Sequence, residues 1–161
     1  MKDSIEALAF GHKSLGMMVN RFCEDLKPEE YLHRPCPGSN CAAWILGHLT
    51  VTDCSAIKTL GGTPPALPEG FEARFSREGD APAASDFGDV TKLLPLFGEV
   101  HGVLIATLLK TPPELLSKPL EKPRPIFSTI GEMASFISHH AAMHVGQITI
   151  IRRSLGRPPL I

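Results

Sequence analysis

Two histidines four residues apart are the residues of this chain best placed to do chemistry. In "SHHAAMHVGQ" (138–147), His140 and His144 have the i, i+4 spacing that puts two side chains on one face of a helix. Two imidazoles so placed can reach one metal ion. His48, in the middle of a second uncharged segment, is the best candidate for a third ligand. Three neutral imidazoles leave a divalent ion at least one open position, as in catalytic sites, where the ion lowers the pKa of a bound water or thiol.

A simpler interpretation is that these histidines are core residues with hydrogen-bond partners. H-x-x-x-H pairs arise by chance on helices, so the spacing alone leaves both interpretations open. Burying several imidazoles costs free energy unless each ring nitrogen is satisfied, and a metal satisfies several at once. His12 and His101 each stand singly on an apolar stripe. For those two the core interpretation is favoured, although either could also line a cavity beside the metal.

Other catalytic motifs are disfavoured. A zincin protease carries Glu directly after its first histidine, and here that position is Ala141. "LGGTPP" lacks the Lys-Ser/Thr of a phosphate-binding loop, and no G-x-S-x-G is present. Cys41 lies at an expected helix start, which favours a thiolate, but it has no clear base partner and is interpreted as a packing residue. No C-x-x-C pair occurs among the four cysteines, Cys23, Cys36, Cys41 and Cys54.

Four segments with helical periodicity must position the histidines. Apolar residues recur at intervals of three and four in each, and no segment shows convincing period-two alternation. Pro- and Gly-rich connections separate them. The pattern predicts an all-α fold, a four-helix bundle. The connection 61–88 is long for a bundle and can return the chain to its starting end, which makes the second and third helices parallel. The expected helices are residues 4–26, 40–60, 89–110 and 128–155.

Length and charge narrow the class of protein. The 161 residues fit one domain, 1–161. Sixteen basic and seventeen acidic side chains nearly cancel, which argues against nucleic acid or an anionic membrane as the main partner. No apolar run approaches the ~20 residues of a membrane span, and the N-terminus does not resemble a signal peptide. We therefore expect a cytoplasmic protein with reduced cysteines.

Two of the expected helices are uncharged over long stretches. No Asp, Glu, Lys or Arg occurs from 40 to 52 or from 133 to 151. A helix that is apolar nearly all round is buried on more than one side. In a small domain this indicates a contact between two copies as well as an internal core, so we expect a homodimer.

Two motifs together resemble the DinB/YfiT-like family of four-helix-bundle metalloenzymes. "WILGHLTVTD" (44–53) carries a histidine in the family's G-H-[LI] context. "HAAMHVGQITIIRRSLGRPP" (140–159) carries H-x-x-x-H-x-G-Q, a hydrophobic stretch, Arg and L-G-x-P-P. The helix count, the long middle connection and the C-terminal stop extend the resemblance along the whole chain.

The resemblance implies an up-down-down-up bundle with a crossover between the second and third helices. It implies that His48, His140 and His144 bind a divalent zinc, nickel, iron or manganese ion. Homodimers are common in the family, and some relatives are transferases or isomerases that use thiols such as bacillithiol, mycothiol or glutathione. The first hypothesis is therefore a metal-dependent transferase that joins a low-molecular-weight thiol to a small electrophile, with small molecules as its partners.

Two other functions stay open at this stage. One is a non-catalytic, metal-stabilised binding or stress-response protein, suggested because neither Asp53 nor Glu132 adjoins a histidine of the triad in sequence. The other is a metal-dependent hydrolase. Within the second motif, Gly146 suggests a close helix–helix approach, and Gln147 a hydrogen bond across the bundle. His139 points about 100° away from His140.

Overall fold

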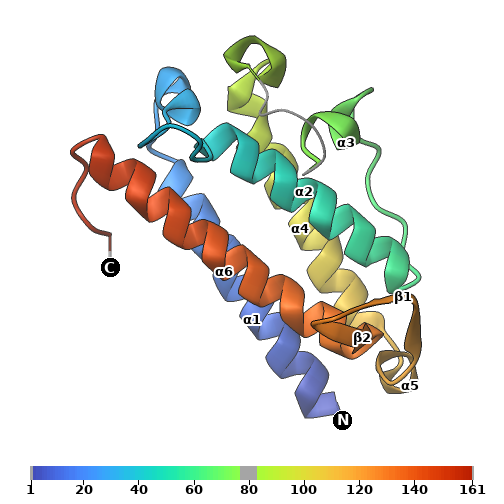
Figure 1. Cartoon of the computed structure of the whole chain (residues 1–161). Coiled ribbons are helices and arrows are strands. Elements are labelled where there is room, and N and C mark those ends of the chain that lie inside the picture. The colour runs from blue at the N-terminus through green and yellow to red at the C-terminus, as the bar shows by residue number, and fades with distance from the viewer. Residues whose placement is uncertain (1, 77–82, 161) are drawn as a thin grey trace.

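Four long helices form a bundle in the computed structural model, which describes residues 2–76 and 83–160 (Figure 1). The all-α four-helix bundle expected from the sequence is confirmed, and its helix ends lie within a few residues of the expected ones. Ser39 and Asn40 are residue types that cap helices, and the sequence predicts that one of them caps the second long helix; that prediction is wrong, because Cys41 occupies the N-cap. The long helices are α1 (Lys2–Cys23), α2 (Ala42–Thr59), α4 (Leu93–Lys110) and α6 (Ile130–Ser154).

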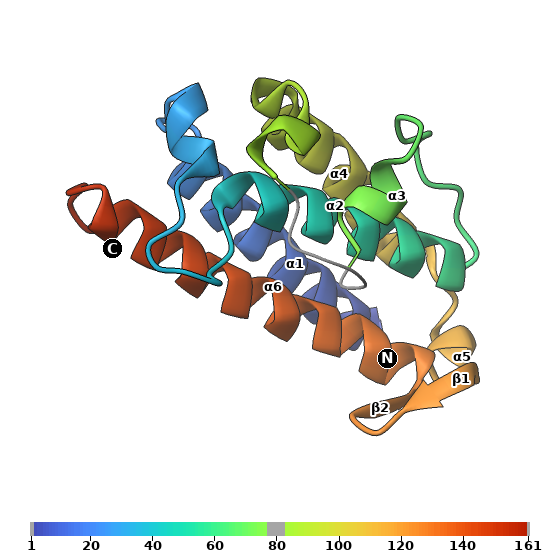
Figure 2. The same ribbon diagram turned by 45° about the horizontal axis from the view of Figure 1, so that its top comes forward.

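Short elements fill the connections. Three are 3-10 turns and two are single-turn α-helices, and α3 lies beside α2 in both views (Figures 1 and 2). Part of the long connection therefore folds back over the bundle. The 3-10 turns are η1 (Pro28–Leu32), η2 (Ala84–Phe87) and η3 (Val90–Lys92), and the short helices are α3 (Phe71–Arg74) and α5 (Pro113–Leu116).

A β-hairpin precedes α6, and the expectation of no strands is wrong there. Strand β1 (Pro119–Arg124) pairs antiparallel with β2 (Phe127–Thr129). Most of β1 is exposed, so its sequence "PLEKPR" lacks the apolar alternation of a half-buried strand. Two prolines weaken the sequence signal further, although an exposed edge strand tolerates them.

The long helices contact one another in a closed ring. Helix α1 contacts α4 and α6, and α2 contacts the same two helices. A Cβ on Gly62, just after α2, would lie 2.9 Å from the side chain of Thr107 near the end of α4. The C-terminal ends of α2 and α4 therefore meet, and these two helices run in the same direction, with α6 running opposite to α2 (Figure 1).

The central place of α2 explains its uncharged sequence. It packs against α3, α4, α6 and η1, and most of its residues are buried. Helix α4 is also apolar in composition, although only six of its 18 residues are buried. By length and composition the segment Val90–Lys110 could cross a membrane, contrary to the expectation that no run would approach that length. In the bundle its apolar stripe instead packs against α1 and α2.

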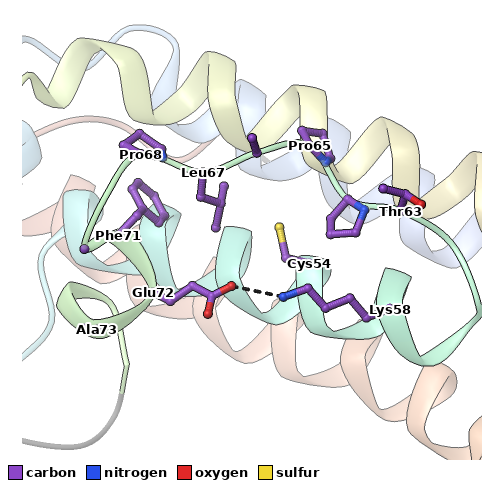
Figure 3. Close-up of a pocket in the computed structure, with 12 residues that line it drawn as sticks. Cys54, Lys58, Thr63, Pro65, Leu67, Pro68, Phe71, Glu72 and Ala73 are labelled. Atoms are coloured by element: carbon purple, nitrogen blue, oxygen red, sulfur yellow. Dashed lines mark hydrogen bonds and ion pairs between the residues drawn. The ribbon is translucent and has the colours of Figure 1, made fainter.

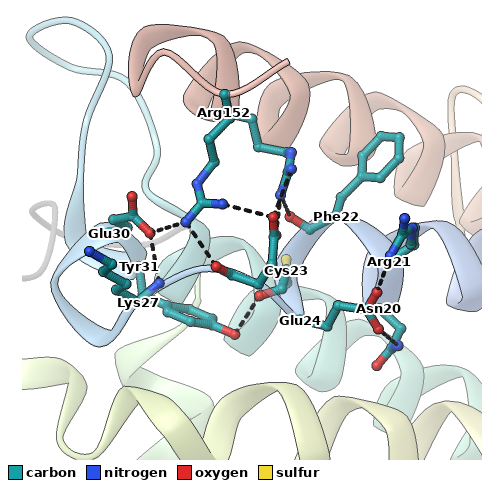
Figure 4. A network of polar contacts seen from close by, with 11 residues as sticks. Asn20, Arg21, Phe22, Cys23, Glu24, Lys27, Glu30, Tyr31 and Arg152 are labelled. Atoms are coloured by element: carbon teal, nitrogen blue, oxygen red, sulfur yellow. Dashed lines mark hydrogen bonds and ion pairs between the residues drawn. The ribbon is translucent and has the colours of Figure 1, made fainter. Parts of the chain in front are cut away.

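A polar network fastens the C-terminal end of α6 to α1 (Figure 4). The buried guanidinium of Arg152 donates to the carbonyl of Phe22 at 2.8 Å and to the carboxylate of Asp25. Arg157 donates to the same carboxylate at 2.7 Å. Tyr31 donates its hydroxyl hydrogen to the carbonyl of Cys23 at 2.9 Å. These contacts give the Arg and L-G-x-P-P parts of the C-terminal motif a structural role.

Candidate metal centre

The imidazoles of His48, His140 and His144 converge inside the bundle. The Nε2 atom of His140 lies 3.3 Å from Nε2 of His48 and 3.1 Å from Nε2 of His144. All three side chains are buried, and their ligand atoms lie within 4.8 Å of one another. In a tetrahedral site with Zn–N bonds of about 2.0–2.1 Å, two ligand nitrogens are roughly 3.3 Å apart. The spacing of these nitrogens therefore fits a divalent metal.

The carbonyl oxygen of Phe75 sets the tautomer of His48. Nδ1 of His48 donates to that oxygen at 3.0 Å, which leaves the lone pair of Nε2 directed toward the other two rings. Phe75 reaches this position because Gly47 has no side chain: a Cβ there would lie 2.2 Å from the phenyl ring. The glycine of the G-H-L motif thus lets the backbone of the long connection approach the three histidines.

The side chain of Gln147 sets the tautomer of His144 in the same way. Its Oε1 accepts from Nδ1 of His144 at 3.0 Å and from Nδ2 of Asn40, before α2, also at 3.0 Å. The expected hydrogen bond of Gln147 across the bundle is therefore present. Metal-binding histidines usually donate their second nitrogen in this way, which fixes the ring and raises its basicity. The expected close approach at Gly146 is wrong, since a Cβ there would meet no atom within 4 Å.

Trp44 is part of the site, a role that its place in the 44–53 motif did not predict. Its indole stacks on the ring of His48, with centroids 4.6 Å apart and planes within 9°. It also lies at 6.0 Å from the ring of His144. The signal available in the sequence was its place one helical turn before His48. Stacking holds the His48 ring in the plane that its hydrogen bond requires.

A groove of about 400 Å³ opens from the histidines toward the β-hairpin. It runs between α2 and α6, and His48 and His140 lie in its wall. A small molecule in the groove would therefore reach His48 and His140. The other lining residues are Val51, Thr52, Ser55, Ala56, Thr59, Leu120, Lys122, Arg124, Phe127, Met133, Phe136 and Ile137.

Neither nearby carboxylate is placed to act as a base at the metal centre. Asp53 is buried and accepts from Nδ1 of His101 at 2.7 Å. Glu132 accepts from the backbone N–H groups of Ser128 and Thr129, and these hydrogen bonds hold the pKa of its carboxyl below the usual range. Glu132 thereby caps α6. No Asp or Glu lines the described part of the groove.

His12 and His101 form a separate polar cluster in the core, and neither lines the groove. Nε2 of His101 donates to the carbonyl of His12 at 2.8 Å, and Nε2 of His12 donates to the carbonyl of Ala134 at 2.9 Å. His139 is exposed, with Nδ1 donating to the carbonyl of Ser135 at 2.9 Å. Of the six histidines considered from the sequence, the structure brings three together.

A second hollow, of about 520 Å³, lies on another side of α2 and contains a cysteine (Figure 3). The 63–73 segment covers it, and Lys58 pairs with Glu72 at 3.3 Å beside it. Burial raises the pKa of the Cys54 thiol to about 11, so this thiol is protonated near neutral pH. Cys41 is fully buried in the core, which agrees with its interpretation as a packing residue.

Comparison with known proteins identifies the family of this chain. The model of the DinB superfamily matches residues 14–148, which contain all three histidines. The chain belongs to the DinB superfamily. A solved structure similar to this DinB-superfamily chain is YfiT from Bacillus subtilis, described as "a probable metal-dependent hydrolase with an unusual four-helix bundle topology". The two share 18% sequence identity and a TM-score of 0.71 over 98% of this chain and 91% of that one. No curated protein sequence matches this one.

Proposed function

We propose that this protein is a metal-dependent enzyme whose divalent ion is held by His48, His140 and His144. The observation that carries the proposal is the convergence of three buried Nε2 atoms at a groove long enough for a small molecule. Hydrogen bonds on Nδ1 of His48 and of His144 keep their Nε2 lone pairs available to an ion. Imidazole ligands suit zinc, nickel and iron, whereas manganese prefers oxygen ligands and fits the triad least well of the four. A bound ion would supply a Lewis acid that makes a thiol or water nucleophilic near neutral pH.

The reaction we propose is transfer of a low-molecular-weight thiol to a small electrophile. The sulfur forms a bond to an electrophilic carbon, whose leaving group departs with its electron pair, and the thiol proton passes to solvent. The chain's residues would bind and orient the two molecules in the groove. The lack of a carboxylate in the described groove lining supports this chemistry, since a thiolate leaving its proton to solvent requires no protein base.

Hydrolysis is the second candidate, favoured by the description of YfiT. Ester or amide hydrolysis gains from a general acid that protonates the leaving group. Asp53 and Glu132 are both engaged elsewhere, as described above. That engagement makes thiol transfer the better-supported reaction.

Elemental analysis of untagged protein tests the metal centre. We expect close to one transition-metal ion per chain in the wild type and in His139→Ala, a matched control that removes an exposed neighbouring histidine. His144→Ala should lose the metal. Metal retained in His144→Ala, or absent from all three proteins even after titration with zinc or nickel, would contradict the proposal.

Activity assays then separate the functions. Thiol-dependent consumption of chlorodinitrobenzene by the wild type, lost in His144→Ala, would support transfer. Thiol-independent cleavage of nitrophenyl esters would favour hydrolysis. A metal that raises the melting temperature while neither substrate is turned over would favour a non-catalytic metal-stabilised protein.

A further inference from the structure

One wall of the groove carries two cationic side chains. Leu120, Lys122 and Arg124, at every second position of β1, all line it. Glu121, which lies between Leu120 and Lys122 in the strand, is absent from the lining. The hairpin therefore presents positive charge to the groove and its negative charge elsewhere.

These two charges have no acidic partner in the described parts of the chain. Neither Lys122 nor Arg124 forms an ion pair with a described residue, whereas Lys58, Lys92 and Arg157 each do. The nearby carboxylate of Glu132 is occupied by the N-terminal cap of α6. Positive charge facing a groove without a carboxylate attracts an anion.

The remaining groove surface is mostly apolar. Phe127, Phe136 and Met133 line it beside the hairpin. On α2 the lining side chains run from His48 to Thr59, eleven residues later, or roughly 16 Å along the helix at 1.5 Å per residue. A ligand that fills this length has one end near the histidines and the other near the hairpin.

We infer that the groove binds a small amphiphile with an oxyanion at its far end. The anionic group lies at Lys122 and Arg124. The guanidinium of Arg124 can donate two parallel hydrogen bonds to it. The apolar body lies against Phe127 and Phe136. The ligand end beside the histidines is the reacting end, and this assignment rests on the proposed function. The anion subsite itself requires no metal.

Calorimetric titration with octanesulfonate tests the subsite. This molecule has an apolar chain for the groove and a sulfonate group that binds metals only weakly. The full-length protein is used as purified and after chelator treatment. We expect one saturable site with the same affinity in both forms, weakened by salt. Lys122→Gln/Arg124→Gln should bind at least about tenfold more weakly. Lys110→Gln/Lys118→Gln removes the same charge from exposed positions off the groove and should bind as the wild type does.

Two further measurements locate the ligand. Ser55→Trp fills the groove from an exposed position of α2 and should abolish binding while leaving the cations in place. Octanol, which has the same chain without the charge, should bind far more weakly than octanesulfonate. Three results would each overturn the inference. The first is equal affinity of Lys122→Gln/Arg124→Gln and Lys110→Gln/Lys118→Gln for octanesulfonate. The others are unchanged binding in Ser55→Trp and binding that disappears after chelator treatment. Metal content, measured separately, reports on the proposed function, so the two can fail independently.

Discussion

At the candidate metal centre, contacts from outside the triad orient the imidazoles of His48 and His144. Gln147 accepts from His144 and is itself held by Asn40. The carbonyl of Phe75 accepts from His48, and the indole of Trp44 covers the same ring. These neighbours leave both Nε2 atoms able to bind an ion, so substitutions at them test the centre without removing a ligand.

Gln147→Leu should weaken metal binding by about 10–100-fold, because Nδ1 of His144 loses its acceptor. Competition with a chromogenic chelator measures the affinity. Gln147→Glu keeps an acceptor oxygen and should bind metal as tightly as the wild type or more tightly. A Leu variant with wild-type affinity would show that this hydrogen bond does not support the centre.

Gly47→Ala should destabilise the fold by about 1–3 kcal/mol, because its Cβ would overlap the ring of Phe75. Urea unfolding measures the free energy. Gly102→Ala is the matched control: it is also within a helix, and its Cβ would meet no atom within 4 Å. The control should stabilise the protein by about 0.5–1 kcal/mol through helix propensity. Equal effects at the two positions would contradict the close approach of Phe75.

Among the helices, α2 and α4 are joined by a buried ion pair. Nδ1 of His101 faces the carboxylate of Asp53, and its Nε2 faces the carbonyl of His12, so both ring nitrogens must donate and the ring is cationic. Burial of the ring lowers the pKa of His101, but the hydrogen bond and charge of Asp53 outweigh that effect, and the pKa lies above its ordinary value. A cation is therefore held in the core by one carboxylate.

Asp53→Asn should make the stability of the protein more sensitive to acid. Because the pKa of His101 is raised on folding, its stabilisation is fully present below the unfolded pKa of about 6.5 and is lost as pH rises through the folded pKa. We expect Asp53→Asn to lose about 2–4 kcal/mol near pH 5.5 and less near pH 8. Urea unfolding across this range measures the difference.

His12 also contributes to the pH dependence of wild-type stability, so the wild type alone does not report on His101. Burial lowers the pKa of His12, which opposes the effect of His101 on the pH dependence of stability. The difference between wild type and Asp53→Asn isolates the contribution of the carboxylate. A difference independent of pH would mean that His101 is neutral in the folded protein.

Across the whole molecule, one face of α6 remains exposed and apolar. Met143 and Ile150 are 57% and 59% exposed, and Gly146 lies between them on the same helical stripe. The homodimer expected from the uncharged sequence of this helix stays a prediction, and this is the face on which we expect it. The uncharged sequence of α2, in contrast, is accounted for by contacts within one chain.

Met143→Glu/Ile150→Glu should convert the dimer to a monomer, because it places charge in a desolvated contact. Sedimentation equilibrium measures the mass. Ile126→Glu is the control, as Ile126 is an exposed apolar residue of the hairpin turn. A wild type that is monomeric, or a double variant that remains dimeric, would exclude this face.

Periodicity and local spacing were enough to predict the four long helices and the i, i+4 pair His140 and His144. Both depend on the geometry of a single helix, which the sequence encodes directly. Placing His48 with that pair combined its uncharged setting with the resemblance of two motifs to a known family.

Only the tertiary structure shows that Phe75 packs against Gly47 and that Asp53 pairs with His101. It alone shows that Lys122 and Arg124 line a groove. Each of these contacts joins residues from different elements, or from a loop and a helix, at separations that no local pattern describes. The hairpin escaped prediction because its charged face borders the groove rather than the core, so its strands lack a buried alternation. Helix periodicity fixes which side chains share a face, but the packing of helices and loops decides what each face meets.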